Sequence, residues 1–173
     1  SIFKERIALD LYEHPKDGSK AVALEISELI KKKQSENKKC ILGLATGSSP
    51  LSIYSELIRL HKEDNLSFKN VITFNLDEYL PMDQKSKHSY NKFMYDNLFN
   101  HIDVQRENIN IPRGDLTPNE VEQYCIEYEN KINSLGGIDF QLLGIGRNGH
   151  IGFNEPGSLE SSITRKVNIE YST

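Results

Sequence analysis

Two adjacent carboxylates, Asp77 and Glu78, directly follow an apolar run at residues 71–75. Carboxylates at the mouth of a buried strand are costly unless they are hydrogen-bonded or used. One of the two could therefore be a general base whose pKa is tuned by burial. The alternative is that Asp77 caps a helix and Glu78 lies beside it in solvent. The local sequence leaves both interpretations open.

A histidine, His150, lies in a glycine-rich stretch, with Asn148 two residues before it and Glu155 five residues after it. An imidazole titrates near neutral pH and can pass a proton in either direction. Glu155 could orient the ring and raise its basicity. A lone histidine is usually structural, but these neighbours, placed after an apolar run, favour a role in proton transfer.

The glycines of this stretch also match a second pattern. Residues 144–149 read G-x-G-x-x-G, which by letter is a dinucleotide-binding fingerprint. That motif has to open a helix, and the chain runs instead into residues 153–156 (FNEP), which cannot continue a helix far. We therefore expect no dinucleotide here.

A third polar cluster, residues 46–50 (TGSSP), follows the apolar run at residues 40–45. Gly47 lets the backbone approach a ligand, and the hydroxyls of Ser48 and Ser49 at a helix start suit a phosphate. It is no Walker A loop, because the Gly-Lys-Ser/Thr ending is absent. An ordinary strand-to-helix turn is the equally weighted alternative.

The elements that must position these clusters alternate along the chain. Apolar runs predict strands at residues 40–45, 71–75 and 138–145, and more weakly at 6–11. Two helices are predicted to begin at caps, one at Asp17 and one at Ser49, which precedes Pro50. Two more are predicted over residues 89–100 and over residues 117–135, the second with a capping box from Thr117 to Glu120.

This alternation predicts the fold. Strands that are apolar on both faces imply a parallel sheet covered by helices. We expect one doubly wound, Rossmann-like α/β domain over residues 1–173, with a mostly parallel sheet and helices on both faces. In such sheets the ligand binds outside the carboxyl ends of the strands, where all three polar clusters fall.

Composition limits the classes of partner. A formal net charge of −4 argues against nucleic acid. No apolar run reaches the roughly 20 residues that would span a membrane, and the N-terminus lacks a signal-peptide pattern, so we expect a cytoplasmic protein. Cys40 and Cys125 share no metal-ligand spacing with histidines, and we expect neither a disulfide nor a metal.

Taken together, residues 45–50 (ATGSSP), 74–79 (FNLDEY) and 144–156 (GIGRNGHIGFNEP) resemble glucosamine-6-phosphate deaminase. The likeness runs from about residue 40 to residue 165. The resemblance implies that glucosamine 6-phosphate is isomerised from aldose to ketose and deaminated, giving fructose 6-phosphate and ammonia by acid–base catalysis without a metal or an organic cofactor.

The resemblance also implies roles for single residues. His150, held by Asn148 and Glu155, would help to open the sugar ring, and Asp77 would move the proton from C2 to C1. Gly47, Ser48 and Ser49 would receive the phosphate of the amino-sugar substrate.

Two departures from the family pattern matter. Many members carry Asp at the position of Asn148, which leaves open whether this residue moves a proton or only orients the imidazole. Members of the family are also longer, so we expect a fragment that lacks further phosphate ligands and the last sheet elements. The full-length protein could be a homo-oligomer.

Two other functions are weighed against the deaminase. A 6-phosphogluconolactonase-type hydrolase shares the fold. That family, however, typically has Asp-Glu-Arg where residues 77–79 of this chain read Asp-Glu-Tyr, and Ser-Leu-Phe-Pro where residues 153–156 read Phe-Asn-Glu-Pro. A non-enzymatic sugar-phosphate sensor could keep the phosphate-binding residues 46–49, here called the serine loop. It would need neither Asp77 as a general base nor His150 for ring opening.

Overall fold

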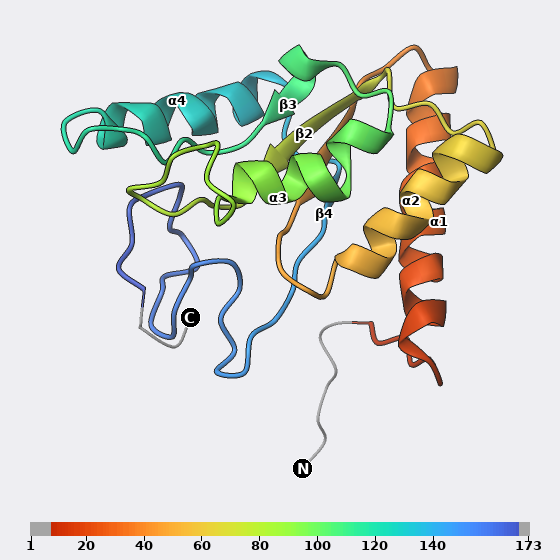
Figure 1. Cartoon of the computed structure of the whole chain (residues 1–173), viewed down its shortest axis with the longest axis horizontal. Coiled ribbons are helices and arrows are strands. Elements are labelled where there is room, and N and C mark those ends of the chain that lie inside the picture. The colour runs from red at the N-terminus through yellow and green to blue at the C-terminus, as the bar shows by residue number, and fades with distance from the viewer. Residues whose placement is uncertain (1–7, 170–173) are drawn as a thin grey trace.

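The computed structural model describes residues 8–169 (Figure 1). The helices and strands follow in the order α1 (Pro15–Ser35), β1 (Cys40–Leu44), α2 (Leu51–Glu63), β2 (Val71–Asn75), α3 (Tyr90–Asn97), β3 (Ile109–Asn110), α4 (Val121–Ser134) and β4 (Phe140–Gln141). Short 3-10 helices at Phe99–His101 and Arg106–Asn108 lie between α3 and β3. Helices and strands therefore alternate as the apolar pattern predicts.

The sheet has the order β3-β2-β1-β4, and every neighbouring pair is parallel. β1 and β2 form its centre and pair along their whole length, from Cys40 opposite Val71 to Leu44 opposite Asn75. All residues of these two strands are buried. Their burial on both faces is why they are continuous apolar runs instead of alternating ones.

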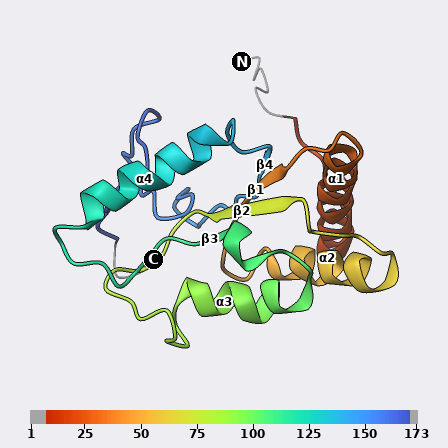
Figure 2. The ribbon, with the colours of Figure 1, turned by 90° about the horizontal axis from the view of Figure 1, so that it is seen from above.

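Helices cover both faces of the sheet, as predicted (Figure 2). On one face, the main core joins α1, α2 and α3 to β1 and β2 through residues such as Ile26, Leu57, Met94 and Leu42. On the other face, Tyr128 of α4 packs against strand residues in a smaller cluster. The doubly wound α/β architecture is thus confirmed.

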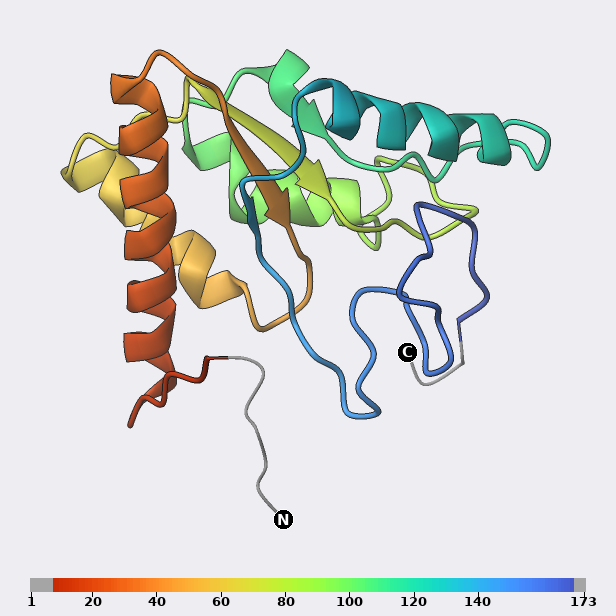
Figure 3. The ribbon, with the colours of Figure 1, turned by 180° about the vertical axis from the view of Figure 1, so that it is seen from behind.

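The strand order reverses at β1. The chain moves outward from β1 through β2 to β3, and then returns to place β4 on the opposite side of β1. Ligands of open α/β sheets bind at such a reversal, outside the carboxyl ends of the strands. Figure 3 shows the segments that follow β1, β2 and β4 on the same side of the sheet.

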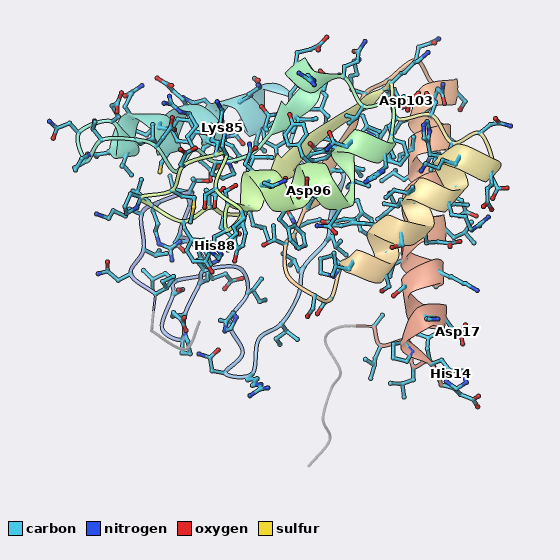
Figure 4. The ribbon with its side chains drawn as sticks, in the orientation of Figure 1. His14, Asp17, Lys85, His88, Asp96 and Asp103 are labelled. Atoms are coloured by element: carbon cyan, nitrogen blue, oxygen red, sulfur yellow. The ribbon has the colours of Figure 1, made fainter. Side chains whose placement is uncertain are left out.

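Two predicted helix starts are wrong. α1 begins at Pro15, after His14, and Asp17 lies within the first turn instead of capping it (Figure 4). Proline suits this position because the missing N–H has no partner there in any case. Likewise Ser49 does not cap α2: Pro50 precedes this helix in a helical conformation, without a side-chain cap.

The other helix starts agree better with the sequence. Ser89 caps α3 by accepting a hydrogen bond from the Lys92 N–H at 3.0 Å. Before α4, the Glu120 carboxylate accepts from the Thr117 N–H at 2.8 Å and from its hydroxyl at 2.7 Å, as a capping box requires of its glutamate. The helix itself begins only at Val121, after a turn, and not at residue 117 as predicted.

Two predicted strands need correction. Residues 8–11 form no strand, and residues 6–7 lie outside the described part of the chain. The strand predicted at 138–145 is only Phe140–Gln141. It pairs with β1 alone and continues by a single bond from the Leu142 N–H to the Gly43 carbonyl, so residues 143–145 have no strand partner among the described residues.

Candidate active site

A cavity of about 350 Å³ opens beside the carboxyl end of β2. Asp77 lines it, together with residues 152–154 of the segment 144–156 that carries His150, which we call the histidine loop. The start of α4 and residues 162–167 close its other sides. The cavity therefore lies where the reversed strand order predicts a ligand.

Asp77 is largely buried, and its pKa is raised from 3.8 to about 6. Burial is the largest cause and the negative charge of Glu78 adds to it, while the backbone N–H of Phe153 donates to the Asp77 carboxylate and lowers the pKa. A carboxyl group that titrates near 6 is mostly ionised at neutral pH yet accepts a proton readily. These are the properties of a general base.

Glu78, the neighbouring carboxylate, is bound to the start of α3. Its Oε1 accepts from the N–H groups of Tyr79 and Tyr90 at 2.9 and 3.0 Å, and its Oε2 accepts from the Asn91 N–H at 3.0 Å. The interpretation in which Asp77 caps a helix and Glu78 is solvated is therefore wrong. It is Glu78 that helps to cap α3, together with Ser89, and both carboxylates line the cavity.

The three polar side chains of the histidine loop form a chain of hydrogen bonds. Asn148 Nδ2 donates to Glu155 Oε2 at 2.9 Å, and Asn148 Oδ1 lies 2.6 Å from His150 Nδ1. An amide oxygen can only accept, so Nδ1 carries the proton and Nε2 the lone pair. The same amide oxygen also accepts from the His150 backbone N–H at 3.1 Å, so Asn148 binds both the ring and the backbone of His150.

Two glycines allow this loop to pack closely. A Cβ at Gly152, which has φ +58°, would lie 2.9 Å from Asp77 Oδ2. A Cβ at Gly146 would lie 2.0 Å from the His150 ring. Any side chain at these two positions would displace a candidate catalytic group.

An aromatic cluster of Tyr79, Tyr90 and Phe153 joins the loops. The ring centroids of Tyr79 lie 5.0 Å from Tyr90 and 4.9 Å from Phe153. The Tyr90 hydroxyl donates to the Tyr79 hydroxyl at 3.2 Å and accepts from the Thr46 side chain. Tyr90 thus contacts residues that follow β1, β2 and β4.

Sequence reasoning missed the roles of Thr46, Tyr90 and Phe153. Thr46 and Phe153 lie within recognised motifs and Tyr90 lies in the predicted helix 89–100, but nothing in the spacing of residues 46, 90 and 153 indicates that they meet. Their proximity results from the strand order and from the fixing of α3 by Glu78.

The serine loop lies at the end of β1. Gly47 has φ +96° with open space around its Cα, so the backbone conformation alone favours glycine. Ser48 and Ser49 are exposed immediately before α2. The cavity beside Asp77 is not lined by the serine loop, nor by His150, Asn148 or Glu155. Asp77 contacts the histidine loop through Gly152 and Phe153 instead.

The described residues contain no group of three or more His, Cys, Asp or Glu side chains arranged to hold a metal ion. Cys40 is buried and Cys125 partly buried, and both are free thiols. No helix between residues 8 and 169 is long and apolar enough to cross a membrane.

Residues 13–161 match the protein family described as glucosamine-6-phosphate isomerases/6-phosphogluconolactonase. Glucosamine-6-phosphate deaminase of Thermoanaerobacter sp. is 48% identical over 83% of this chain and 54% of its own length. The Clostridium botulinum deaminase is 46% identical over 96% of this chain and 65% of its own.

A solved monomeric glucosamine-6-phosphate deaminase is similar in structure, with a TM-score of 0.87 and 42% identity over 93% of this chain and 64% of that one. The chain thus spans between about half and two thirds of the length of these three relatives.

Proposed function

We propose that this chain, which belongs to the family of glucosamine-6-phosphate isomerases and 6-phosphogluconolactonases, carries the base and the ring-opening residues of a glucosamine-6-phosphate deaminase. The relatives at 46–48% identity are deaminases by name. The observation that carries the proposal is the largely buried Asp77, whose pKa is raised to about 6 at the mouth of β2.

Ring opening would fall to His150. Its Nε2 has the lone pair, because Asn148 holds the proton on Nδ1, and it can move a proton to or from the ring oxygen of the sugar. Glu155 acts through Asn148, which it binds at 2.9 Å. An amide has no proton to exchange at neutral pH, so in this proposal Asn148 orients the ring and moves no proton.

Asp77 would then take the proton from C2 of the open-chain amino sugar and return it to C1. The electron pair of the broken C2–H bond forms a double bond between C2 and C1, which gives an enol-type intermediate. Protonation at C1 then leaves an imine at C2. Water adds to the imine, ammonia leaves, and fructose 6-phosphate results. Each positioned acid–base step contributes about 10²- to 10⁴-fold in rate.

The phosphate would lie at the end of β1, on Gly47, Ser48 and Ser49. This loop is exposed, precedes α2 and sits at the reversal of the strand order. Backbone N–H groups at a helix start attract an anion. The binding of the amino-sugar phosphate at these residues rests on that position alone.

The extent of the domain is part of the proposal. We infer that residues 1–173 belong to a single α/β domain whose remaining elements complete the phosphate site and the sheet beyond β4. The length of the relatives supports this. A homo-oligomer of the complete protein is a further proposal, although the solved relative is described as monomeric. A cytoplasmic location is proposed from the two free thiols.

Ammonia release from glucosamine 6-phosphate tests the function. The complete polypeptide that carries this chain should release ammonia, and its Asp77→Asn variant should release almost none. Asp96→Asn, which removes a carboxylate from the exposed face of α3 (Figure 4), should retain the activity of the parent.

Each alternative function predicts a different result. A folded parent that binds the sugar phosphate without releasing ammonia would support the sensor, and ligand binding would then survive Asp77→Asn. Hydrolysis of 6-phosphogluconolactone in place of deamination would support the hydrolase.

A further inference from the structure

The carboxylate next to the base makes an unusual number of backbone contacts. Glu78 accepts hydrogen bonds from Tyr79, Tyr90 and Asn91, all between 2.9 and 3.0 Å. Tyr90 and Asn91 are the first two residues of α3. Glu78 therefore ties the segment that follows β2 to the start of a helix more than ten residues further along the chain.

The Glu78 cap shares the start of α3 with one other residue. The Lys92 N–H, third in the helix, is bound by Ser89 Oγ at 3.0 Å. Glu78 and Ser89 thus satisfy the first three N–H groups of α3 between them. Only Glu78 does so with a charge, and only Glu78 adjoins Asp77. Substitutions of Glu78 and Ser89 can therefore be compared, because each removes a cap of α3 but only the first removes a charge.

The Glu78 carboxylate is held by three backbone N–H donors at the start of α3. Its negative charge lies beside Asp77 and contributes to the raised pKa of that carboxyl group. Tyr90 and Tyr128 are also close enough to interact electrostatically with Asp77. Burial raises the pKa of both phenols, however, so they are neutral at physiological pH. The remaining charged residues that line the cavity are Arg113, Glu129, Arg165 and Lys166.

We propose that Glu78 is a positioning residue for the base: its contacts with α3 hold Asp77 at the cavity and keep a fixed negative charge next to it. The inference rests on the proposed function, in which Asp77 is the base. It adds that the base depends on the neighbouring carboxylate, which acts on the reaction through Asp77.

Titration of the Asp77 carboxyl carbon by NMR in the complete, ¹³C-labelled polypeptide tests the inference without any activity. Glu78→Gln keeps the amide oxygen as an acceptor for Tyr79 and Tyr90 but removes the charge. The Asp77 midpoint should fall by on the order of one pH unit. Ser89→Ala removes the uncharged cap of the same helix, and should leave the midpoint where it is in the parent.

The pH dependence of kcat/KM gives a second measurement. In Glu78→Gln the acid limb that reports the base should move to lower pH, with a loss in kcat because the base is weaker. Glu78→Asp keeps the charge but is one methylene too short for the same contacts, so kcat should fall with little movement of the limb.

Three results would overturn the inference: an unmoved Asp77 midpoint in a folded Glu78→Gln, an equal movement in Ser89→Ala, or a Glu78→Asp variant with the kcat of the parent. A parent that titrates as expected but releases no ammonia would instead reject the proposed function and leave the electrostatic part of the inference intact.

Discussion

Replacing Asp77 with Asn should stabilise the folded protein at neutral pH while removing its turnover. The structure holds the carboxyl group of Asp77 in a largely buried position beside Glu78, and its pKa is raised from 3.8 to about 6. A difference of this size corresponds to about 3 kcal/mol, at about 1.4 kcal/mol for each pKa unit. This is the free energy that the ionised base costs the folded state.

The sign follows from proton binding. The folded state binds the Asp77 proton more tightly than the unfolded chain does, because its pKa is the higher of the two. The stability linked to this group is therefore fully present below pH 3.8 and is lost as the pH rises through about 6. The asparagine side chain of the variant does not ionise, so the free energy of unfolding of the variant should not fall as the pH rises through this range.

The assay is the free energy of unfolding from urea titrations of the parent and Asp77→Asn, each at about pH 4 and at about pH 8. The advantage of the variant should approach 3 kcal/mol at the higher pH and nearly vanish at the lower one. Asp96→Asn controls for the loss of one negative charge from a chain of net charge −4, and should give no comparable gain.

Two outcomes would refute the reasoning. An Asp77→Asn variant that is no more stable than the parent at the higher pH would mean that the buried charge carries no penalty. An advantage of equal size at both values would mean that the gain comes from something other than the ionisation of Asp77.

Three further substitutions test the loops around the base. Gly152→Ala, whose Cβ would lie 2.9 Å from Asp77 Oδ2 at φ +58°, should lower the free energy of unfolding by about 1–3 kcal/mol and reduce kcat. Asn148→Ala, which leaves His150 Nδ1 without its acceptor, should lower kcat for ammonia release by at least about tenfold, with little change in thermal unfolding. Tyr90→Phe keeps the ring in the aromatic cluster but removes two hydroxyl contacts, and kcat/KM should fall by about 5- to 30-fold, as steady-state assays would show.

The central part of the fold could be predicted because it depends on a simple pattern. Residues 71–75 are a strand with the predicted bounds, and β1 ends one residue before the predicted end. Strands buried on both faces are apolar throughout, and this leaves a clear mark in the sequence. Their ends then indicate where polar clusters gather, which is how the sequence points to residues 46–50 after β1 and to Asp77 after β2.

The edges of elements were harder to predict, because they depend on what packs against them. Residues 138–145 are apolar almost throughout, yet only Phe140 and Gln141 pair as a strand. Leu143 and Ile145 are exposed, so the apolar run extends beyond both the paired strand and the buried core of the described residues. The start of α1 was misplaced for a similar reason, since Pro15 and Asp17 both suit a first turn.

The identity of the base is the point at which sequence and structure contribute different halves of one argument. Adjacent carboxylates repel each other, so both cannot be buried and ionised unless one is strongly stabilised. The sequence offered a base or a cap as alternatives for Asp77. The structure supplies both roles at once, because the start of α3 takes Glu78 through three N–H groups. Asp77 is then the carboxylate without such stabilisation. It receives one N–H from Phe153 and remains near its titration midpoint, which is the condition for accepting and returning a proton.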